Sequence, residues 1–164
     1  MNKDGKIVNF FNYVKGEAQM LNVFDVAKYI LSKAGEMTTM KLQKLVYYSQ
    51  AWHLAWYGVP LFNEDFQAWS NGPVCPELFS AHKGLFVIDK SKLQYGDDAK
   101  LKGNPKGTVD SIIDFYGDKD AHWLSMLTHK ERPWLKARDG IPEGDYCINI
   151  IEKEEMQDYY SGLS

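Results

Sequence analysis

One stretch of the chain is too apolar to form a surface helix, and this constrains the fold more than any other feature. When residues 42–57 are placed about 100° apart, as in an α-helix, apolar and aromatic side chains cover most of the circumference. The clear polar positions are Gln43, Lys44 and Gln50. Thr39 is placed to cap the start of this helix, and Gly58 predicts its end. We therefore expect a central helix that other elements surround.

Shorter patterns predict further helices and little strand. The predicted helices lie over residues 22–34, 76–82, 108–116, 121–127, 133–138 and 152–160. An extended run at residues 65–69 enters a turn, and residues 147–151 alternate weakly in a way that allows pairing with it. Residues 89–105 are charged and low in apolar content, which predicts a long surface loop. The fold class is therefore mainly α, a single compact helical domain around a buried central helix, with a small β-hairpin or short sheet.

Composition and charge limit the classes of function. A chain of 164 residues with 45% hydrophobic and 25% charged residues is ordinary for one globular domain. A formal net charge of −3 argues against a protein that binds nucleic acid by neutralising phosphates. Residues 140–164 are acidic, which is typical of a solvated helix face and could also steer a basic partner. With five Trp, ten Tyr and eight Phe, the chain has aromatic side chains to spare for protein binding.

Cysteine usage and hydropathy point to the cytoplasm. The two cysteines, Cys75 and Cys147, match no metal-ligand spacing with the four histidines, so we expect neither a metal nor another cofactor. The sequence contains no signal peptide and no apolar run long enough for a membrane span. We therefore expect a cytoplasmic protein with reduced thiols and no membrane contact.

Two residue pairs invite a catalytic interpretation. Ser49 and His53 lie one helical turn apart, as a nucleophile and its base could, but no carboxylate follows to orient the imidazole. The structural interpretation is that backbone groups or a tyrosine hydroxyl satisfy both. Cys75 and His82 are separated by nearly two helical turns, which prevents a direct local hydrogen bond. We therefore predict that the protein is not an enzyme, with a hydrolase as the outside alternative.

Several ordered motifs resemble one family. They are NVFDVAKYIL at residues 22–31, KLQKLVYYSQAWHLAWYGVPLF at residues 41–62, AWSNGPVCPELF at residues 68–79 and LSMLTHKERPWLKAR at residues 124–138. Together they resemble the Panacea antitoxin domain, the family of SocA-like and phage-associated proteins, over roughly residues 22–160. We accordingly divide the chain into an N-terminal arm or extra helix at residues 1–20 and a Panacea-like domain at residues 21–164.

The resemblance implies a function that composition alone does not give. It implies a small, non-enzymatic antitoxin that neutralises a cognate protein toxin, encoded beside it, by direct binding. Because the family pairs with unrelated toxins, the resemblance does not identify the toxin. It leaves open an adaptor that delivers the toxin to a host protease, and a homo-oligomer. A DNA-binding repressor is an outside alternative.

Candidate toxin-binding residues follow from the parts of the chain that vary around a shared scaffold. Such variation is expected in the N-terminal arm, with Phe10, Phe11 and Tyr13, and in the 89–105 loop, with Tyr95. Aromatic side chains of this kind commonly anchor protein interfaces. The alternative for the arm is that it packs on its own domain or is a mobile terminus.

A second candidate surface is the turn that contains Trp69 and Asn71. Asn71-Gly72 permits positive φ and the ring of Pro73 restricts the next backbone angle, so this turn should be rigid and could bind at low entropic cost. We favour a scaffold role, in which Trp69 and Pro73 pack on the central helix, over a contact role.

Deleting residues 1–20 tests the role of the arm. We expect the truncated chain to fold, as measured by circular dichroism, and to protect cells poorly from the toxin, because aromatic anchors would be missing. Protection equal to that of the full chain would show that the arm is not the contact. Failure to fold would place the arm in the core.

Overall fold

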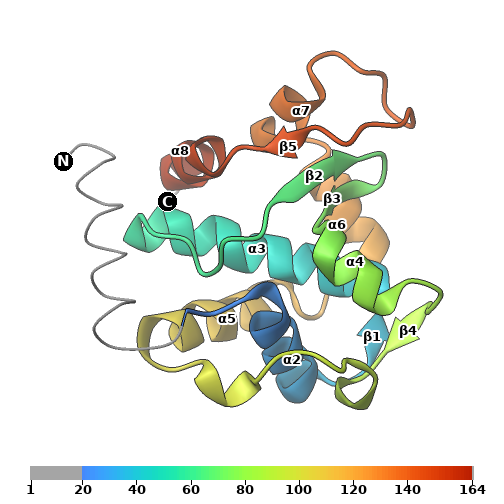
Figure 1. Cartoon of the computed structure of the whole chain (residues 1–164). Helices are drawn as coiled ribbons and strands as arrows, with labels where there is room; N and C mark the ends of the chain where they lie inside the picture. The colour runs from blue at the N-terminus through green and yellow to red at the C-terminus, as the bar shows by residue number, and fades with distance from the viewer. Residues whose placement is uncertain (1–19, 164) are drawn as a thin grey trace.

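Helix α3 (Thr39–Tyr57) runs through the middle of the molecule, as the sequence predicts (Figure 1). The computed structural model describes residues 20–163. The other elements are α2 (Val23–Ala34), β1 (Met37–Thr38), β2 (Phe66–Trp69), β3 (Gly72–Val74), α4 (Pro76–His82), β4 (Val87–Ile88), the 3-10 helices η1 (Lys90–Lys92) and η2 (Asp98–Lys100), α5 (Gly103–Tyr116), α6 (Ala121–Thr128), α7 (Arg132–Arg138), β5 (Ile150–Ile151) and α8 (Lys153–Leu163). The mainly α prediction is confirmed. Among residues 20–163, no helix is both long and apolar enough to cross a membrane.

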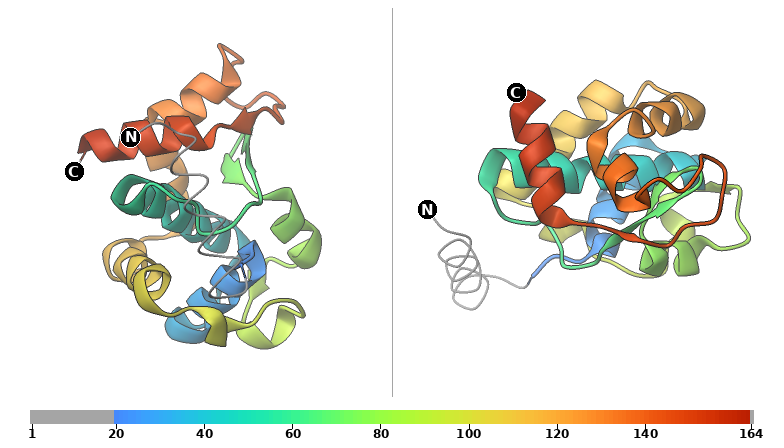
Figure 2. Two further views of the ribbon diagram at one scale, coloured as in Figure 1. Left: turned by 60° about the vertical axis from the view of Figure 1, so that its left-hand side comes forward. Right: turned by 90° about the horizontal axis from the view of Figure 1, so that it is seen from above.

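Other elements surround α3 for most of its length. Helix α8 lies on one side, α2 and α5 lie on the other, and α6 and β3 complete the enclosure (Figures 1 and 2). Every residue from 42 to 51 is buried, including Gln43, Lys44 and Gln50, which the helical projection left as polar positions. The prediction of a surrounded helix is therefore confirmed, and the polar side chains prove to be part of the core.

The ends of α3 depend on local backbone chemistry. Gly58 ends the helix with φ 72° and ψ 10°, in the left-handed region that favours glycine. At the other end, the hydroxyl of Thr38 accepts the Lys41 N–H at 3.1 Å and caps the helix, one residue before the predicted cap at Thr39. Thr39 instead donates its hydroxyl to the carbonyl of Leu85 at 3.2 Å, which ties α3 to the segment before β4.

Two small sheets complete the fold. One has strand order β3-β2-β5 and the other pairs β1 with β4, all antiparallel. In the larger sheet Phe66 lies opposite Ile151 and Gln67 lies opposite Ile150, which confirms the predicted pairing of residues 65–69 with residues 147–151. Phe66, Ala68 and Ile151 are buried on the inner face, where α7 packs against β2 and β5.

Helix α2 begins with a capping box, and its acidic residue also bonds a segment far along the chain. Asn22 and Asp25 cap each other's backbone N–H groups, at 2.9 and 3.0 Å. Asp25 also accepts the N–H of Asp97 at 2.7 Å. Gly96, with φ 97°, lies so close that an added Cβ would be 2.4 Å from the carbonyl oxygen of Phe24. The polar side chain of Asp25 therefore fixes a distant segment against α2.

Residues 89–105 lie mostly at the surface, as their composition predicts, but they are not one irregular loop. They form η1 and η2, and Leu93 and Leu101 are buried in the core beside α2. These two apolar side chains anchor the segment. They are too few to change its average composition, which is why the composition does not indicate them. Helix α5 also begins earlier than predicted, at Gly103, so Thr108 is a buried interior residue and not a cap. Phe115, near the end of α5, is 68% exposed.

A buried carboxylate joins three helices. Glu131, at the start of α7, accepts hydrogen bonds from the hydroxyls of Tyr48 in α3 at 2.6 Å and Tyr160 in α8 at 2.8 Å. The hydroxyls of Tyr160 and Tyr47 lie 3.2 Å apart. Burial raises the pKa of Glu131, and the two tyrosine hydrogen bonds oppose that shift. Glu131 is therefore a structural acceptor that joins α8 and α7 to the central helix.

Substitutions at Glu131 separate its hydrogen bonds from its charge. Glu131→Ala should lower the free energy of unfolding by roughly 2–4 kcal/mol, because two buried hydroxyls lose their acceptor. Glu131→Gln keeps an acceptor oxygen and should cost much less at pH 7. Since the folded-state pKa lies above the ordinary 4.5, the unaltered protein should lose stability as pH rises through that pKa, and Glu131→Gln should lack this loss. Urea unfolding across this pH range measures both effects. Equal damage by the two substitutions would contradict the proposed role of Glu131.

Candidate protein-binding surface

The β2–β3 hairpin is held from the inside by a buried lysine. Lys44 of α3 is fully buried and donates to the carbonyl of Pro73 at 3.1 Å. Gly72, with φ 112°, lies against the same side chain, and an added Cβ would be 2.6 Å from Lys44 Cε. Burial lowers the pKa of Lys44 to about 7. The Asn71-Gly72-Pro73 turn therefore needs glycine both for its backbone angle and for its close approach to α3.

Other core side chains donate to the remaining carbonyls of this hairpin. Trp134 Nε1 donates to the Trp69 carbonyl at 2.9 Å, and Ser125 donates to the Asn71 carbonyl at 2.6 Å. Arg138, only 2% exposed, donates to the Ala68 carbonyl at 2.8 Å. The backbone of the hairpin is thus fixed by α3, α6 and α7. This fits the scaffold role for Pro73, which bonds Lys44 of the central helix, whereas the Trp69 ring packs on Phe79 of α4 and not on the central helix as expected.

The side chains of Trp69 and Asn71 do not join the buried side chains of this hairpin. Trp69 is half-buried, its ring lies 5.0 Å from that of Phe79 in α4, and its indole N–H donates to Gln67 at 2.8 Å. The side chain of Asn71, at the tip, is exposed. A rigid backbone therefore presents Trp69 beside Phe79 at the surface.

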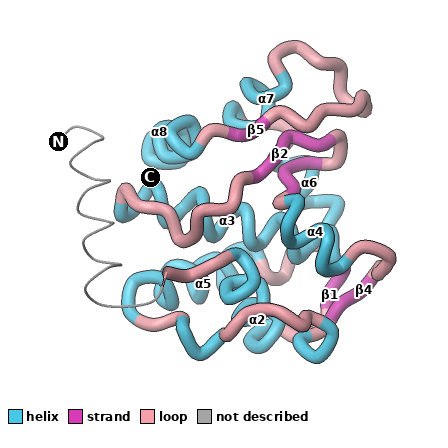
Figure 3. The backbone as a smooth tube through the Cα atoms, viewed as in Figure 1, coloured by secondary structure: helices cyan, strands magenta, loops and turns pink. Residues whose placement is uncertain are grey.

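Strand β5 extends this surface. Ile150, opposite Gln67 in the register, is 45% exposed, and Ile148 is 49% exposed two residues earlier. Among the described residues, no helix lies in front of β2 and β5 in the view of Figure 3. We call Gln67, Trp69, Phe79, Ile148 and Ile150 the outer sheet face. The weak alternation of residues 147–151 predicts the pairing of this strand. It does not by itself show that Ile148 and Ile150 are exposed.

The segment that leads into β5 is fixed and acidic. Arg138 donates to the carbonyls of Pro142 at 2.8 Å and Asp145 at 2.7 Å, which holds the segment after α7 in place. Residues 139–152 contain four acidic residues and no lysine or arginine. Tyr146, within this segment, is 83% exposed. The segment that leads into β5 therefore carries more negative than positive charge.

The other predicted contact residues lie elsewhere. Tyr95 is 58% exposed, but its ring packs 5.3 Å from that of Phe24 on α2, at the opposite end of the molecule from β5 (Figure 1). The structure therefore brings Trp69 and Asn71 together but does not add Tyr95 to them. Phe10, Phe11 and Tyr13 lie outside the described residues.

The Ser49 and His53 side chains are each satisfied by a different structural partner. Ser49 donates to the carbonyl of Leu45 at 2.8 Å, and His53 Nδ1 lies 2.8 Å from the hydroxyl of Thr108. Burial lowers the pKa of His53 to about 4, so its imidazole is neutral at pH 7. This geometry matches the structural interpretation of the pair, with a threonine hydroxyl in place of the expected tyrosine.

Cys75 and His82 are linked through Gln43 and not to each other. The Gln43 amide oxygen accepts the Cys75 N–H at 2.9 Å, and its nitrogen lies 3.0 Å from His82 Nε2. Burial raises the pKa of the Cys75 thiol to about 12. Because the thiolate is the nucleophilic form, this cysteine is poorly suited to attack at neutral pH.

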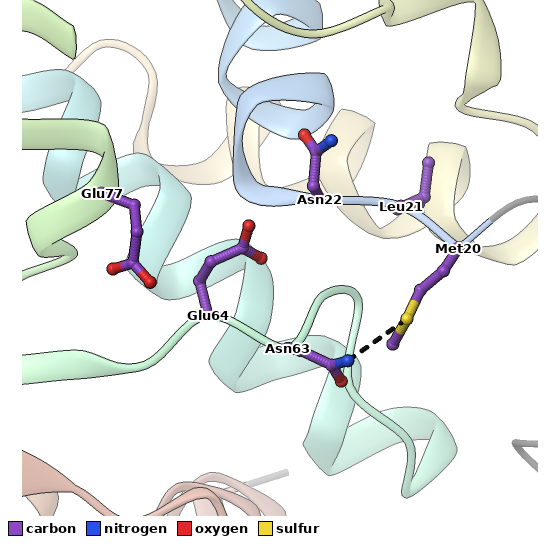
Figure 4. A pocket seen from close by; sticks show the side chains of 6 residues that line it. All are labelled: Met20, Leu21, Asn22, Asn63, Glu64 and Glu77. Atoms are coloured by element: carbon purple, nitrogen blue, oxygen red, sulfur yellow. Dashed lines mark hydrogen bonds between the residues drawn. The ribbon is translucent and has the colours of Figure 1, made fainter.

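A pocket of about 420 Å³ lies where the described chain enters α2 (Figure 4). Met20, Leu21, Asn22, Asn63, Glu64 and Glu77 line it. Glu64 accepts the Val23 N–H at 3.3 Å, and burial raises its pKa. Asn63 donates to the Met20 sulfur at 3.3 Å. These contacts anchor the start of α2, and within residues 20–163 no cluster of three or more His, Cys, Asp or Glu could hold a metal ion.

Comparison with known proteins gives one family. The model of the family described as "Antitoxin SocA-like, Panacea domain" matches residues 42–135, more than half of the chain. Antitoxin SocA of Caulobacter vibrioides (strain NA1000 / CB15N) is 33% identical over 82 residues, which cover 46% of this chain and 44% of that protein. No solved structure matches. The chain therefore spans less than half the length of this curated relative.

Replacing Lys44 by methionine tests how the hairpin is held. Lys44 has a folded-state pKa of about 7 against an ordinary 10.5, so the unfolded chain binds more protons between these values. The unaltered protein should therefore gain stability as pH rises from 7 towards 9, relative to Lys44→Met. Urea unfolding of both proteins across this range measures the difference. A difference that does not change with pH would show that Lys44 stays charged in the folded protein.

Proposed function

The chain belongs to the SocA-like Panacea domain family, and we propose that it is an antitoxin that masks a cognate protein toxin by direct binding. The observation that carries this proposal is the family match over residues 42–135, which includes most of α3, the β2–β3 hairpin and the Trp134 region of α7. The relative that matches is itself named an antitoxin. We further propose that the protein acts in the cytoplasm.

The chemistry of the described residues supports binding more than catalysis. The polar side chains inside the molecule are occupied with structure: Lys44, Gln43 and Arg138 bond backbone carbonyls, and Glu131 bonds tyrosines. Ser49, His53 and Cys75 are buried. By contrast, large apolar side chains are exposed on β5 and in the segment before it, as expected where a protein partner would cover them.

The alternative to masking is that the protein delivers the toxin to a host protease for degradation. A masking antitoxin removes toxicity while the amount of toxin stays constant, whereas an adaptor for a host protease lowers the amount of toxin. The two are separated by measuring toxin abundance and not only survival.

Co-expression with the neighbouring open reading frame tests the proposal. If that frame encodes the toxin, it should stop growth alone, and this protein should restore growth with toxin abundance unchanged on an immunoblot. A purified complex with a defined ratio of the two proteins is expected from size-exclusion chromatography. Restored growth with falling toxin abundance would replace masking by an adaptor role. No protection against a demonstrably toxic frame would contradict the proposed pairing.

Matched variants address the hydrolase alternative. Ser49→Ala and Cys75→Ala remove the two candidate nucleophiles with small changes in volume, so both should fold and protect cells as well as the unaltered protein. A folded variant, checked by circular dichroism, that loses protection would revive the catalytic interpretation at that residue.

A further inference from the structure

The outer edge of strand β5 carries backbone N–H and C=O groups that are not bonded to β2. Strand β5 is the last strand in the order β3-β2-β5, and residues 148–150 are all exposed. The Ala68 N–H donates to the Asn149 carbonyl at 2.8 Å, so Ala68 and Asn149 form a hydrogen-bonded pair of the antiparallel ladder. Such pairs alternate with pairs that exchange no bonds, which makes Gln67 and Ile150 the next, unbonded pair. Ile150 therefore directs its own N–H and C=O away from β2, towards the open edge.

The same residue belongs to an apolar face. The side chains of Ile148 and Ile150 emerge on one side of the strand, next to Gln67 and Trp69 on β2. The backbone under them is held by Arg138 through the Ala68 carbonyl and by Asn149, whose amide donates to the Ala137 carbonyl at 3.0 Å. A bound strand would thus meet a preorganised edge and an apolar surface at once.

The acidic residues in the segment next to β5 favour a basic partner. The four acidic side chains of residues 139–152 are Asp139, Glu143, Asp145 and Glu152, without a lysine or arginine between them. Glu143 contacts His129 at 3.0 Å, and its side chain is 65% exposed. Negative charge of this kind attracts a basic segment and repels an acidic one.

We propose that an extended, basic segment of the toxin, with alternating apolar and positively charged side chains, adds to the β5 edge as a further strand. Its backbone would bond Ile150, its apolar side chains would cover Ile148, Ile150 and Trp69, and its charges would face residues 139–152. The inference rests on the proposed function for the identity of the partner. Apart from Trp69, the residues in this proposal lie outside the family motifs quoted above.

A peptide test separates this surface from toxin neutralisation itself. The probe is a short fluorescein-labelled peptide that alternates lysine and valine, and the control peptide alternates lysine and proline, which keeps the charge but removes half of the backbone donors. On the full chain, the lysine–valine peptide should bind more tightly by fluorescence anisotropy. In NMR spectra it should shift the amide signals of residues 148–151 and the indole signal of Trp69. Equal binding of the two peptides, or shifts confined to other regions, would overturn the proposal.

Variants at Ile150 sharpen the test. Ile150→Pro removes the outward N–H and also replaces the exposed isoleucine side chain, a change that edge strands tolerate. Ile150→Val keeps the N–H and a branched apolar side chain, and Ile150→Ala keeps the N–H but removes most of the side chain, so the two controls separate the backbone bond from the apolar contact. We expect Ile150→Pro to weaken binding of the lysine–valine peptide about tenfold and Ile150→Val to change it little. Similar affinity of Ile150→Pro and Ile150→Val would overturn the proposal.

The acidic segment is tested separately. The double variant Asp145→Asn, Glu152→Gln should bind the lysine–valine peptide more weakly and with less dependence on salt. Unchanged binding would show that the acidic segment does not select a basic partner. If Ile150→Pro does not fold, the NMR shifts on the unaltered chain decide. Toxin neutralisation that persists while the peptide test fails would leave the proposed function intact and move its interface elsewhere.

Discussion

The structure depends on the burial of polar side chains along the central helix. A helix enclosed on all sides cannot leave Gln43, Lys44 or Gln50 in water, so each must find a partner in the elements around it. Lys44 bonds the Pro73 carbonyl and Gln43 bonds both backbone groups of Cys75. Gln50 bonds the Leu61 N–H at 2.7 Å and the Phe62 carbonyl at 2.8 Å. Because these partners all lie between residues 61 and 75, α3 dictates the path of the next segment of the chain.

This arrangement separates the scaffold from the surface. Glu131 joins α7 and α8 to α3, and Arg138 fixes both β2 and the segment before β5. Because buried side chains hold the backbone of the sheet, the exposed side chains of Ile148 and Ile150 are not needed to hold it. Ile148 and Ile150 could therefore change without rebuilding the core. Because each member of a buried polar network depends on its partners, substitutions in this network should cost more stability than substitutions on the surface.

Much of the fold could be predicted from the sequence, and the misses have physical causes. The all-round apolar character of α3 is a local signal, and this helix is as expected. Helices α2, α4 and α7 also lie close to the ranges that short sequence patterns predict. For residues 89–105 the composition predicts the surface position but not the two buried anchors, because Leu93 and Leu101 act singly, below the level of any periodic pattern. The partners of Lys44, Glu131 and Arg138 are distant in the chain, and no local pattern reveals them.

The candidate surface was only partly predictable for the same reason. Trp69 stood out by its place in a rigid turn, whereas Ile148 and Ile150 become a surface only when β5 is paired with β2. Tyr95 is exposed, packs on Phe24 of α2 and stays a separate predicted contact.

Hydrogen exchange of the full chain, free and in complex with the toxin from the neighbouring frame, tests the central claim most directly. If the toxin binds the outer sheet face, exchange should slow at residues 148–151 and in the β2–β3 hairpin. The amides of α3, already protected by burial, should not change. Slowing confined to other parts of the chain, with residues 148–151 unaffected, would contradict the claim.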